Sequence, residues 1–281
     1  RNGHVGLASG DGRGAMSPSN AALQEQAGTV ALLEVNPDLA RDLSSEEMRQ
    51  ALGALVVPAV RIHGGRLEFE VCANDKRVVG SLIGLLVIDG VVVREMMLGP
   101  HVSAQLCGPG DLLELRSARD QRCFPALATI SVPGTAVLAL LDDRVLAASR
   151  RWPRLAGRLL AQALGQIGDA GAHQTISQLP RVEDRLLALF WHLADRWGRV
   201  LPDGVRIDLP LTHETIGRLI GARRPTVTLG LRALRTEGFL ERHDDAAWLL
   251  ARDSWQRLTT ANGRTVRGHR STLPSLADSS D

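Results

Sequence analysis

The residues best suited to chemistry are arginines that gather late in the chain. Between positions 215 and 236 the sequence has five arginines and no acidic residue. Guanidinium groups without neighbouring carboxylates can bind phosphate oxygens and the hydrogen-bonding edges of bases. Lys76 is the single lysine among the 33 basic residues, so arginine is abundant everywhere and the absence of carboxylates is the more informative observation. The segment is therefore a candidate for binding nucleic acid.

Two short helices joined by a tight turn would position these arginines. Thr212 is suited to cap a first helix, and Gly221 provides the flexible backbone that ends it in a sharp turn. Pro225 suits the first turn of a second helix, where a missing N–H costs nothing. Apolar residues spaced three and four apart would form one buried face and leave the arginines outside. This layout predicts a helix-turn-helix, which places its second helix in the major groove of DNA.

The spacing of these residues resembles the helix-turn-helix of the Crp–Fnr family of transcription regulators. The chain keeps the family pattern without a gap at Thr212, Ile216, Gly217, Gly221, Arg224, Thr226, Val227, Leu231, Leu234, Gly238 and Leu240. The recognition helix of that family commonly carries an Arg-Glu pair and a later Arg. Arg224 fills the first position, but Pro225 replaces the Glu and Leu229 replaces the second Arg. The family's preferred DNA sequence is therefore not carried over.

We expect DNA contacts at the start of the first helix and along the second. Arg224 is expected to read base edges, with a guanine as its best partner. The following residues would set the position of the protein on phosphates and nearby bases: Thr212, His213, Arg223, Thr226, Thr228 and Arg232. Apolar runs on either side of His243-Asp244-Asp245 predict a hairpin wing after the second helix. The alternative interpretation is an ordinary amphipathic helical hairpin of a soluble domain.

A long helix predicted over 153–178 has features of a dimer interface. Leu160, Leu164 and Ile167 form an apolar stripe, and Gly165 and Gly168 lie in a neighbouring stripe of small residues. Each glycine inside a helix costs about 1 kcal/mol relative to alanine, so the close approach of another backbone would account for them. The resembled family dimerises through its corresponding helix. Alternatively, the helix packs on its own β-domain and the small residues make room.

The first half of the chain has a β-like pattern that predicts a small antiparallel barrel or sandwich. Three turns divide it: Asp89-Gly90 as a hairpin within 84–98, Gly108-Pro109-Gly110-Asp111, and Pro133-Gly134-Thr135 between strands 127–132 and 136–141. The first two turns resemble those of the cyclic-nucleotide-binding β-roll that precedes the reader domain in Crp–Fnr proteins.

The pattern for binding a cyclic nucleotide is incomplete. Gly110-Asp111 leads to Leu112 and not to the Gly-Glu pair that the resembled nucleotide-binding proteins use for the ribose. Arg116-Ser117-Ala118 comes too early for the phosphate-binding triplet. We therefore expect cyclic AMP to bind weakly or not at all. The cysteines are too few and wrongly spaced for the iron–sulfur clusters of some relatives, and we expect no cofactor and no metal: Cys72, Cys107 and Cys123.

The length of 281 residues leaves room for two modest domains in an α+β fold. We expect a disordered tail at 1–26, a β-roll sensor domain at 27–150, a linker and dimerisation helix at 151–179, a winged helix-turn-helix domain at 180–252 and a flexible tail at 253–281. The net charge of +2 excludes a uniformly basic binder. No apolar run is long enough to span a bilayer and no signal peptide precedes the fold, so we expect a cytoplasmic protein.

The resemblance implies a sequence-specific bacterial transcription regulator that acts as a homodimer on a two-fold symmetric DNA site. Double-stranded DNA and RNA polymerase would be its partners, and an effector of unknown identity stays open. The alternative is a binding module that responds to a cyclic nucleotide or another small molecule and whose helical domain mainly contacts proteins. An enzyme is disfavoured, because the chain has no P-loop, no Gly-x-Ser-x-Gly and no His-Glu-x-x-His, and the glycines at positions 10, 12 and 14 follow no strand.

Overall fold

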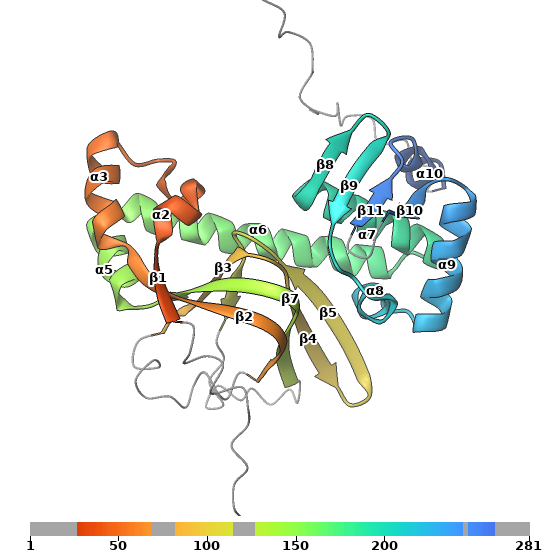
Figure 1. Ribbon diagram of the computed structural model, residues 1–281, viewed down its shortest axis with the longest axis horizontal. Coiled ribbons are helices and arrows are strands. Elements are labelled where there is room, and N and C mark those ends of the chain that lie inside the picture. The colour runs from red at the N-terminus through yellow and green to blue at the C-terminus, as the bar shows by residue number, and fades with distance from the viewer. Residues whose placement is uncertain (1–26, 69–81, 115–126, 244–246, 262–281) are drawn as a thin grey trace, which may run out of the picture. The chain divides into compact units, whose positions relative to one another are not determined.

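Two compact units make up the chain. The computed structural model describes residues 27–68, 82–114, 127–243 and 247–261 (Figure 1). Unit 1 consists of Arg1–Arg94 and Cys107–Ala163, and unit 2 of Glu95–Leu106 and Leu164–Asp281. An antiparallel sheet comes first along the chain and helices predominate after it, which confirms the predicted α+β class. The tail expected at 1–26 lies outside the described residues, as do residues 262–281 of the tail expected at 253–281.

A seven-stranded sheet forms from the first strands of the chain. Its strands are β1 (Ala27–Ala31), β2 (Val56–Glu68), β3 (Gly84–Asp89), β4 (Val92–Leu98), β5 (His101–Cys107), β6 (Leu112–Glu114) and β7 (Leu127–Leu141). The order is β1-β2-β7-β3-β6, while β4 pairs with β5 and β7. In the antiparallel register, β7 places Leu138 opposite Val60 of β2 and Ala139 opposite Leu86 of β3. The last strand of the sheet therefore lies between strands from the first part of the chain.

The turn at Asp89-Gly90 does not close the predicted hairpin. Gly90 has the expected positive φ of 77°, but β3 pairs with β6 and β7, whereas β4 pairs with β5 and β7. A Cβ at Gly90 would lie 2.1 Å from the carbonyl oxygen of Thr135. Glycine is therefore also required by the close approach of β7, and the turn is a corner at which the chain changes its pairing partners. The hairpin in this region is β4–β5, which turns at Gly99 with a φ of 58°.

The predicted turn at Pro133-Gly134-Thr135 is also wrong, because β7 continues through it as one strand of 15 residues. Its partner β2 is paired on both sides of this point, with His63 opposite Thr135 and Gly65 opposite Val132. From His63 to Gly65 the chain advances two positions along β2, whereas the partner positions are three apart along β7. This mismatch is the geometry of a β-bulge. Gly65 has a φ of 113°, a backbone conformation that favours glycine. The backbone of β2 can therefore accommodate the register shift while its pairing with β7 continues.

The turn at Gly108-Pro109-Gly110-Asp111 is confirmed. Asp111 N–H donates to the carbonyl oxygen of Gly108 at 2.9 Å, and Gly108 N–H donates to Asp111 Oδ2 at 2.8 Å. Gly110 has a φ of 90°, a conformation that glycine adopts without steric cost. The turn leads into β6, as the two leucines after it predicted.

Helices in the first 151 residues were missed because the region was interpreted as β-like. They are α2 (Leu32–Val35), η1 (Pro37–Ala40), α3 (Ser45–Ala54) and α5 (Asp143–Arg151). A local signal was available for α3. Ser44 and Glu47 form a capping box, in which Glu47 N–H donates to Ser44 Oγ at 3.3 Å and Ser44 N–H donates to Glu47 Oε2 at 2.8 Å. The spacing Ser-x-x-Glu predicts a helix start from sequence alone.

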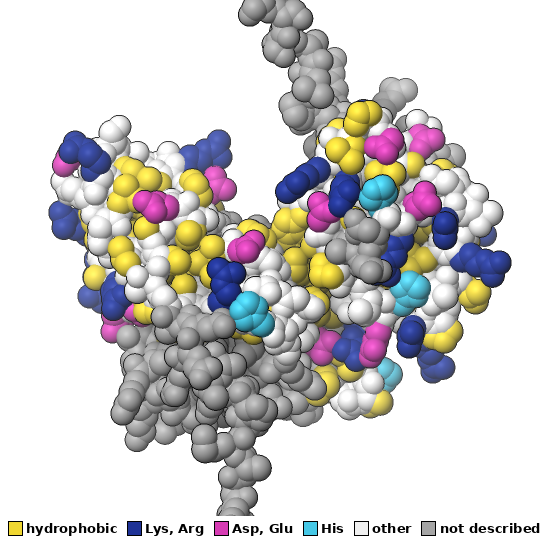
Figure 2. Space-filling view, in the orientation of Figure 1, with side chains coloured by type: hydrophobic (Ala, Val, Ile, Leu, Met, Phe, Trp, Pro, Cys, Tyr) yellow, Lys and Arg dark blue, Asp and Glu magenta, His cyan; other side chains and the backbone are white. Residues whose placement is uncertain are grey.

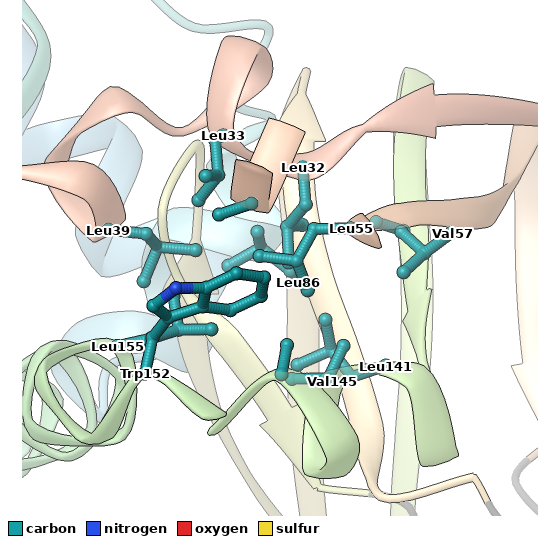
Figure 3. Packing of buried hydrophobic residues seen from close by; sticks show 13 residues of the cluster. Leu32, Leu33, Leu39, Leu55, Val57, Leu86, Leu141, Val145, Trp152 and Leu155 are labelled. Atoms are coloured by element: carbon teal, nitrogen blue, oxygen red, sulfur yellow. The ribbon is translucent and has the colours of Figure 1, made fainter. Parts of the chain in front are cut away.

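An apolar cluster in unit 1 is built around Trp152 (Figure 3). Trp152 is 4% exposed and lies among leucines from separate segments: Leu32, Leu39, Leu55, Leu86 and Leu155. Burying one large apolar side chain stabilises a fold by about 1.5–3 kcal/mol, so the cluster holds α2, η1 and α5 on the sheet. Helix α6 (Pro153–Ser177) begins directly after the tryptophan and confirms the predicted long helix.

Unit 2 contains a helical bundle and a small sheet after α6. The elements are α7 (Val182–Trp197), β8 (Gly198–Leu201), β9 (Gly204–Asp208), α8 (His213–Ile220), α9 (Arg224–Thr236), β10 (Leu240–Arg242), β11 (Ala247–Leu250) and α10 (Ser254–Ala261). The sheet has the order β10-β11-β9-β8. The β10–β11 hairpin is the predicted wing, with Leu240 opposite Leu250. The β8–β9 hairpin was not predicted.

Helix α7 is the centre of the core of unit 2. Leu186, Phe190 and Leu193 are fully buried on its apolar face, and the Phe190 ring lies 4.8 Å from that of Trp248 on β11. Residues 254–261, which we expected in a flexible tail at 253–281, form α10. This helix contacts α7, and Trp191 Nε1 of α7 donates a hydrogen bond to Ser254 Oγ at 3.1 Å. Among the helices that the structure describes, none has the length and apolar character needed to cross a membrane.

Candidate nucleic-acid interface

Helix α8 and the turn after it have the predicted local geometry. Thr212 caps the helix, since its Oγ1 accepts from Thr215 N–H at 3.1 Å. The helix ends at Gly221, which has a left-handed φ of 65°. A Cβ at Gly217 would lie 2.5 Å from the carbonyl oxygen of Ala222. Glycine at position 217 therefore allows the turn to fold back against α8.

Helix α9 is positioned by one buried face. Pro225 lies in its first turn, and Val227, Leu231 and Leu234 are at most 8% exposed. A Cβ at Gly230 would lie 2.7 Å from Leu186 Cδ1 of α7, so the two helices are in close contact there. The other positions of α9 are exposed, except for the half-buried Ala233.

The seven predicted DNA contacts lie together at the start of α8 and along α9. Six of them are exposed and His213 is half-buried. Figure 2 shows basic side chains over α9 with hydrophobic ones between them. The predicted residues are therefore available on the surface, and their grouping agrees with the sequence analysis, whereas contact with DNA itself stays a prediction.

The arginines of this region divide into paired and unpaired groups. Arg218 is paired with Glu214 on its own helix, and Arg235 Nη2 lies 3.5 Å from Glu241 Oε1. The guanidinium groups of three others have no ion-pair partner among the described residues: Arg223, Arg224 and Arg232. The absence of acidic residues between positions 215 and 236 thus leaves three of the five arginines available to an external anion.

A hydrogen bond joins the two helices at their DNA-facing ends. Thr228 Oγ1 donates to the carbonyl oxygen of Arg224 at 3.0 Å, so it must accept from His213 Nδ1, which lies 3.0 Å away. Partial burial lowers the pKa of His213, and the charges of Arg242 and Arg224 lower it further. The imidazole is therefore neutral at pH 7 with its proton on Nδ1. Thr228 keeps a lone pair for a base donor but has no hydrogen left for a phosphate.

One basic residue near this surface was missed. Arg242 ends strand β10 of the wing, and its guanidinium carbon lies 5.2 Å from the centre of the Trp248 ring. Its charge acts on His213, which places it within electrostatic reach of the start of α8. A basic residue directly before the wing loop was the available signal in the sequence.

The predicted dimer residues form an exposed stripe on α6. Leu160, Leu164 and Ile167 are 60%, 57% and 67% exposed. Gly165 and Gly168 are exposed as well, and a Cβ at either position would meet no other atom of the described residues within 4 Å. The described part of the chain therefore does not account for the small residues as room for its own β-domain.

Most of the residues considered for an effector or cofactor site lie outside the described part of the chain. Arg116-Ser117-Ala118, Cys72 and Cys123 lie outside the described residues, and Cys107 is buried. Within the described ranges, no three His, Cys, Asp or Glu side chains are grouped so that they could hold a metal ion.

Three helices, α7 to α9, with the β10–β11 hairpin make a winged helix-turn-helix domain, a class of DNA-binding fold. A comparison with known protein families matches residues 184–257 to the Crp-like helix-turn-helix domain. Residues 184–257 of this chain are therefore similar to the Crp-like helix-turn-helix domain.

Solved structures show that the fold extends beyond the helix-turn-helix. FixK2 from Bradyrhizobium japonicum is 20% identical with a TM-score of 0.54, over 73% of this chain and 97% of its own. A mutant of CooA from Carboxydothermus hydrogenoformans is 18% identical with a TM-score of 0.53, over 82% and 94%. A transcriptional regulator of the CRP family from Thermus thermophilus is 18% identical with a TM-score of 0.52, over 73% and 97%. The comparison with curated proteins found no match.

Proposed function

We propose that this protein is a sequence-specific transcription regulator that binds double-stranded DNA as a homodimer. The observation that carries the proposal is the exposed face of α9, where Arg223, Arg224 and Arg232 have no ion-pair partner among the described residues. They belong to a domain matched to the Crp-like helix-turn-helix. In this proposal, 27–150 is a sensor domain, 151–179 the linker and dimerisation helix, and 180–252 the DNA-binding domain.

Different arginines would contact different parts of the duplex. Arg224 lies at the first position of α9 and is exposed, which suits a bidentate contact with a guanine in the major groove. Arg223 and Arg232 would contact phosphates before and after it. The first turn of α9 has no acidic residue and no side-chain cap, so its free backbone N–H groups also favour an anion.

A dimer is supported by the exposed stripe on α6. Three large apolar side chains together with two glycines offer a surface on which a second helix could pack closely. A two-fold dimer would present two copies of α9 to half-sites about 34 Å apart along the duplex. The proposal includes a cytoplasmic location and contact with RNA polymerase at the bound promoter.

The sensor domain is proposed not to respond to cyclic AMP. The sequence lacks the Gly-Glu pair after Gly110-Asp111, where β6 begins instead with Leu112 and Leu113. Titration calorimetry of the full chain with cyclic AMP should show no heat of binding at micromolar concentrations. A micromolar dissociation constant that is lost in Arg116→Ala would contradict this part of the proposal.

Selection from a random duplex pool, followed by a mobility-shift assay of the full chain, tests the function. We expect one two-fold symmetric sequence to be enriched and its retarded band to weaken as salt is raised. Arg199 on β8, at the sheet edge opposite β10, is exposed, so Arg199→Ala should leave binding unchanged. A chain that enriches no sequence would overturn the proposal and favour a module that contacts proteins.

A further inference from the structure

An apolar side chain stands in the middle of the arginine-bearing face of α9. Leu229 is 67% exposed, the same fraction as Ile167 of the proposed dimer stripe. An α-helix has 3.6 residues per turn, so Pro225, Leu229 and Arg232 at spacings of four and three form one ridge. All three are exposed, whereas Val227 and Leu231 on the opposite side are buried.

The ridge begins with two apolar residues in the half of α9 that would enter the groove. Recognition helices contact base edges mainly with their N-terminal residues. Pro225 lies in the first turn of the helix and Leu229 one turn later. The neighbouring Thr228 donates its hydroxyl hydrogen to the backbone of Arg224. The part of the ridge formed by Pro225 and Leu229 therefore offers bases hydrocarbon groups and no side-chain donor.

Only one base presents an apolar group in the major groove. Thymine carries the C5-methyl group there, whereas the edges of guanine, adenine and cytosine are lined by hydrogen-bonding groups. Covering those groups with a leucine would leave them without water and without a partner, which is unfavourable. A leucine on this ridge therefore favours thymine by attraction and disfavours the other bases by desolvation.

We propose that Leu229 is a specificity-determining residue that contacts the methyl group of a thymine in each half-site, with Pro225 packed beside it. The inference rests on the proposed function, since it requires α9 to lie in the major groove. It adds an apolar element to the base recognition by Arg224.

Thymine-to-deoxyuridine scanning of the selected duplex tests the contact. Deoxyuridine keeps the base pairing and removes only the methyl group. For the full chain, we expect at least one thymine per half-site at which the substitution weakens binding about fourfold, the equivalent of one buried methyl group. Leu229→Ala should bind the thymine and deoxyuridine duplexes with equal affinity at that position, while all other positions keep their ranking.

The matched control is Leu146→Ala, which truncates another exposed leucine, 44% exposed on α5, and should preserve the fourfold difference. A selected duplex without any methyl-sensitive thymine, or one whose sensitivity survives Leu229→Ala, overturns the inference alone and leaves the DNA-binding proposal standing. If Leu229→Ala keeps the sensitivity to deoxyuridine but no longer binds a protein partner, the leucine makes a protein contact. Failure to enrich any sequence overturns the DNA-binding proposal together with this inference.

Discussion

At the scale of single residues, the arginines of α9 differ in what they can reach. Arg224 starts the helix and Arg232 lies two turns later, so only the former is placed where recognition helices read bases. Arg235 is paired with Glu241 and has less to offer an external anion. Sequence position separates Arg224 from Arg232, whereas only the structure shows that Arg235 already has a partner.

The roles of Arg224 and Arg232 predict different binding defects. Arg224→Ala should weaken binding by about 1–3 kcal/mol and relax the choice of base at one position of each half-site, because a bidentate base contact is lost. Arg232→Ala should weaken binding to all sequences equally, because phosphates carry no sequence information. Competition mobility shifts with single-base variants measure both effects. Equal loss on every variant for Arg224→Ala would contradict base reading.

Gly217 predicts a stability defect at the turn of the helix-turn-helix. A methyl group there would lie 2.5 Å from the carbonyl oxygen of Ala222, so Gly217→Ala should lower the free energy of unfolding by at least about 1 kcal/mol. Gly157 of α6 is exposed with nothing within 4 Å of a Cβ. Gly157→Ala should instead stabilise by about 0.5–1 kcal/mol. Urea denaturation of both variants measures the difference, and equal effects would contradict the steric argument.

At the scale of elements, α6 and α7 meet at a pair of histidines. The rings of His173 and His192 lie 4.9 Å apart, and neither His173 Nδ1 nor His192 Nε2 has a hydrogen-bond partner among the described residues. Burial lowers the pKa of His173 from 6.5 to about 4, and the charges of His192 and Arg196 add to the effect while Asp169 opposes it. The contact between the two helices therefore requires a neutral imidazole.

This histidine predicts acid sensitivity. Between pH 6.5 and about 4 the unfolded chain binds a proton at His173 that the folded chain does not, so stability is full above pH 6.5 and falls as the pH falls through this range. The loss between pH 7 and pH 5 should be about 2 kcal/mol. Urea denaturation at the two pH values should show that His173→Gln, which cannot be protonated, loses correspondingly less. The same loss in both proteins would contradict the assignment.

The exposed stripe of α6 predicts the oligomeric state. Gly165→Leu combined with Gly168→Leu should give monomers in sedimentation, because a close approach of two helices has no room for the added side chains. The same helix offers a control in Ala170→Leu, because Ala170 is exposed and lies on the opposite side of the helix from Gly165 and Gly168, about 140° and 160° around its axis. A dimer that survives the double substitution would show that this face is not the interface.

At the scale of the whole molecule, the charge that binds DNA has to be local. The net charge is +2 with 31 acidic residues, so the chain as a whole does not attract a polyanion. If Arg223 and Arg232 of each protomer contact phosphates, a dimer displaces counterions at no fewer than four phosphates. The logarithm of the binding constant should then fall against the logarithm of salt concentration with a slope of about −3.6 or steeper. Mobility shifts at several salt concentrations measure it, and a slope near −1 would contradict a dimer bound through both copies of α9.

What the sequence determined by itself were the elements whose causes are local. The Thr212 cap, the left-handed Gly221 and Pro225 at the start of α9 each act within one turn of the chain, and the helical spacing of the buried residues follows from the same few turns. For this reason the helix-turn-helix, its outward arginines and the long α6 were predictable.

The pairing of the strands and the ion pairs of the arginines depend on the packing of the folded chain. Asp89-Gly90 has the backbone conformation of a hairpin turn, yet β3 pairs with β7 from far along the chain, because burial of both strands outweighs the local preference. The same holds for Pro133-Gly134-Thr135, where pairing with β2 continues through residues that favour a turn. The pairing of Arg235 with Glu241 likewise depends on where the chain returns after the recognition helix. Strand partners and ion pairs join residues whose distance in space is set by the packing of the whole domain, and no short stretch of sequence contains that information.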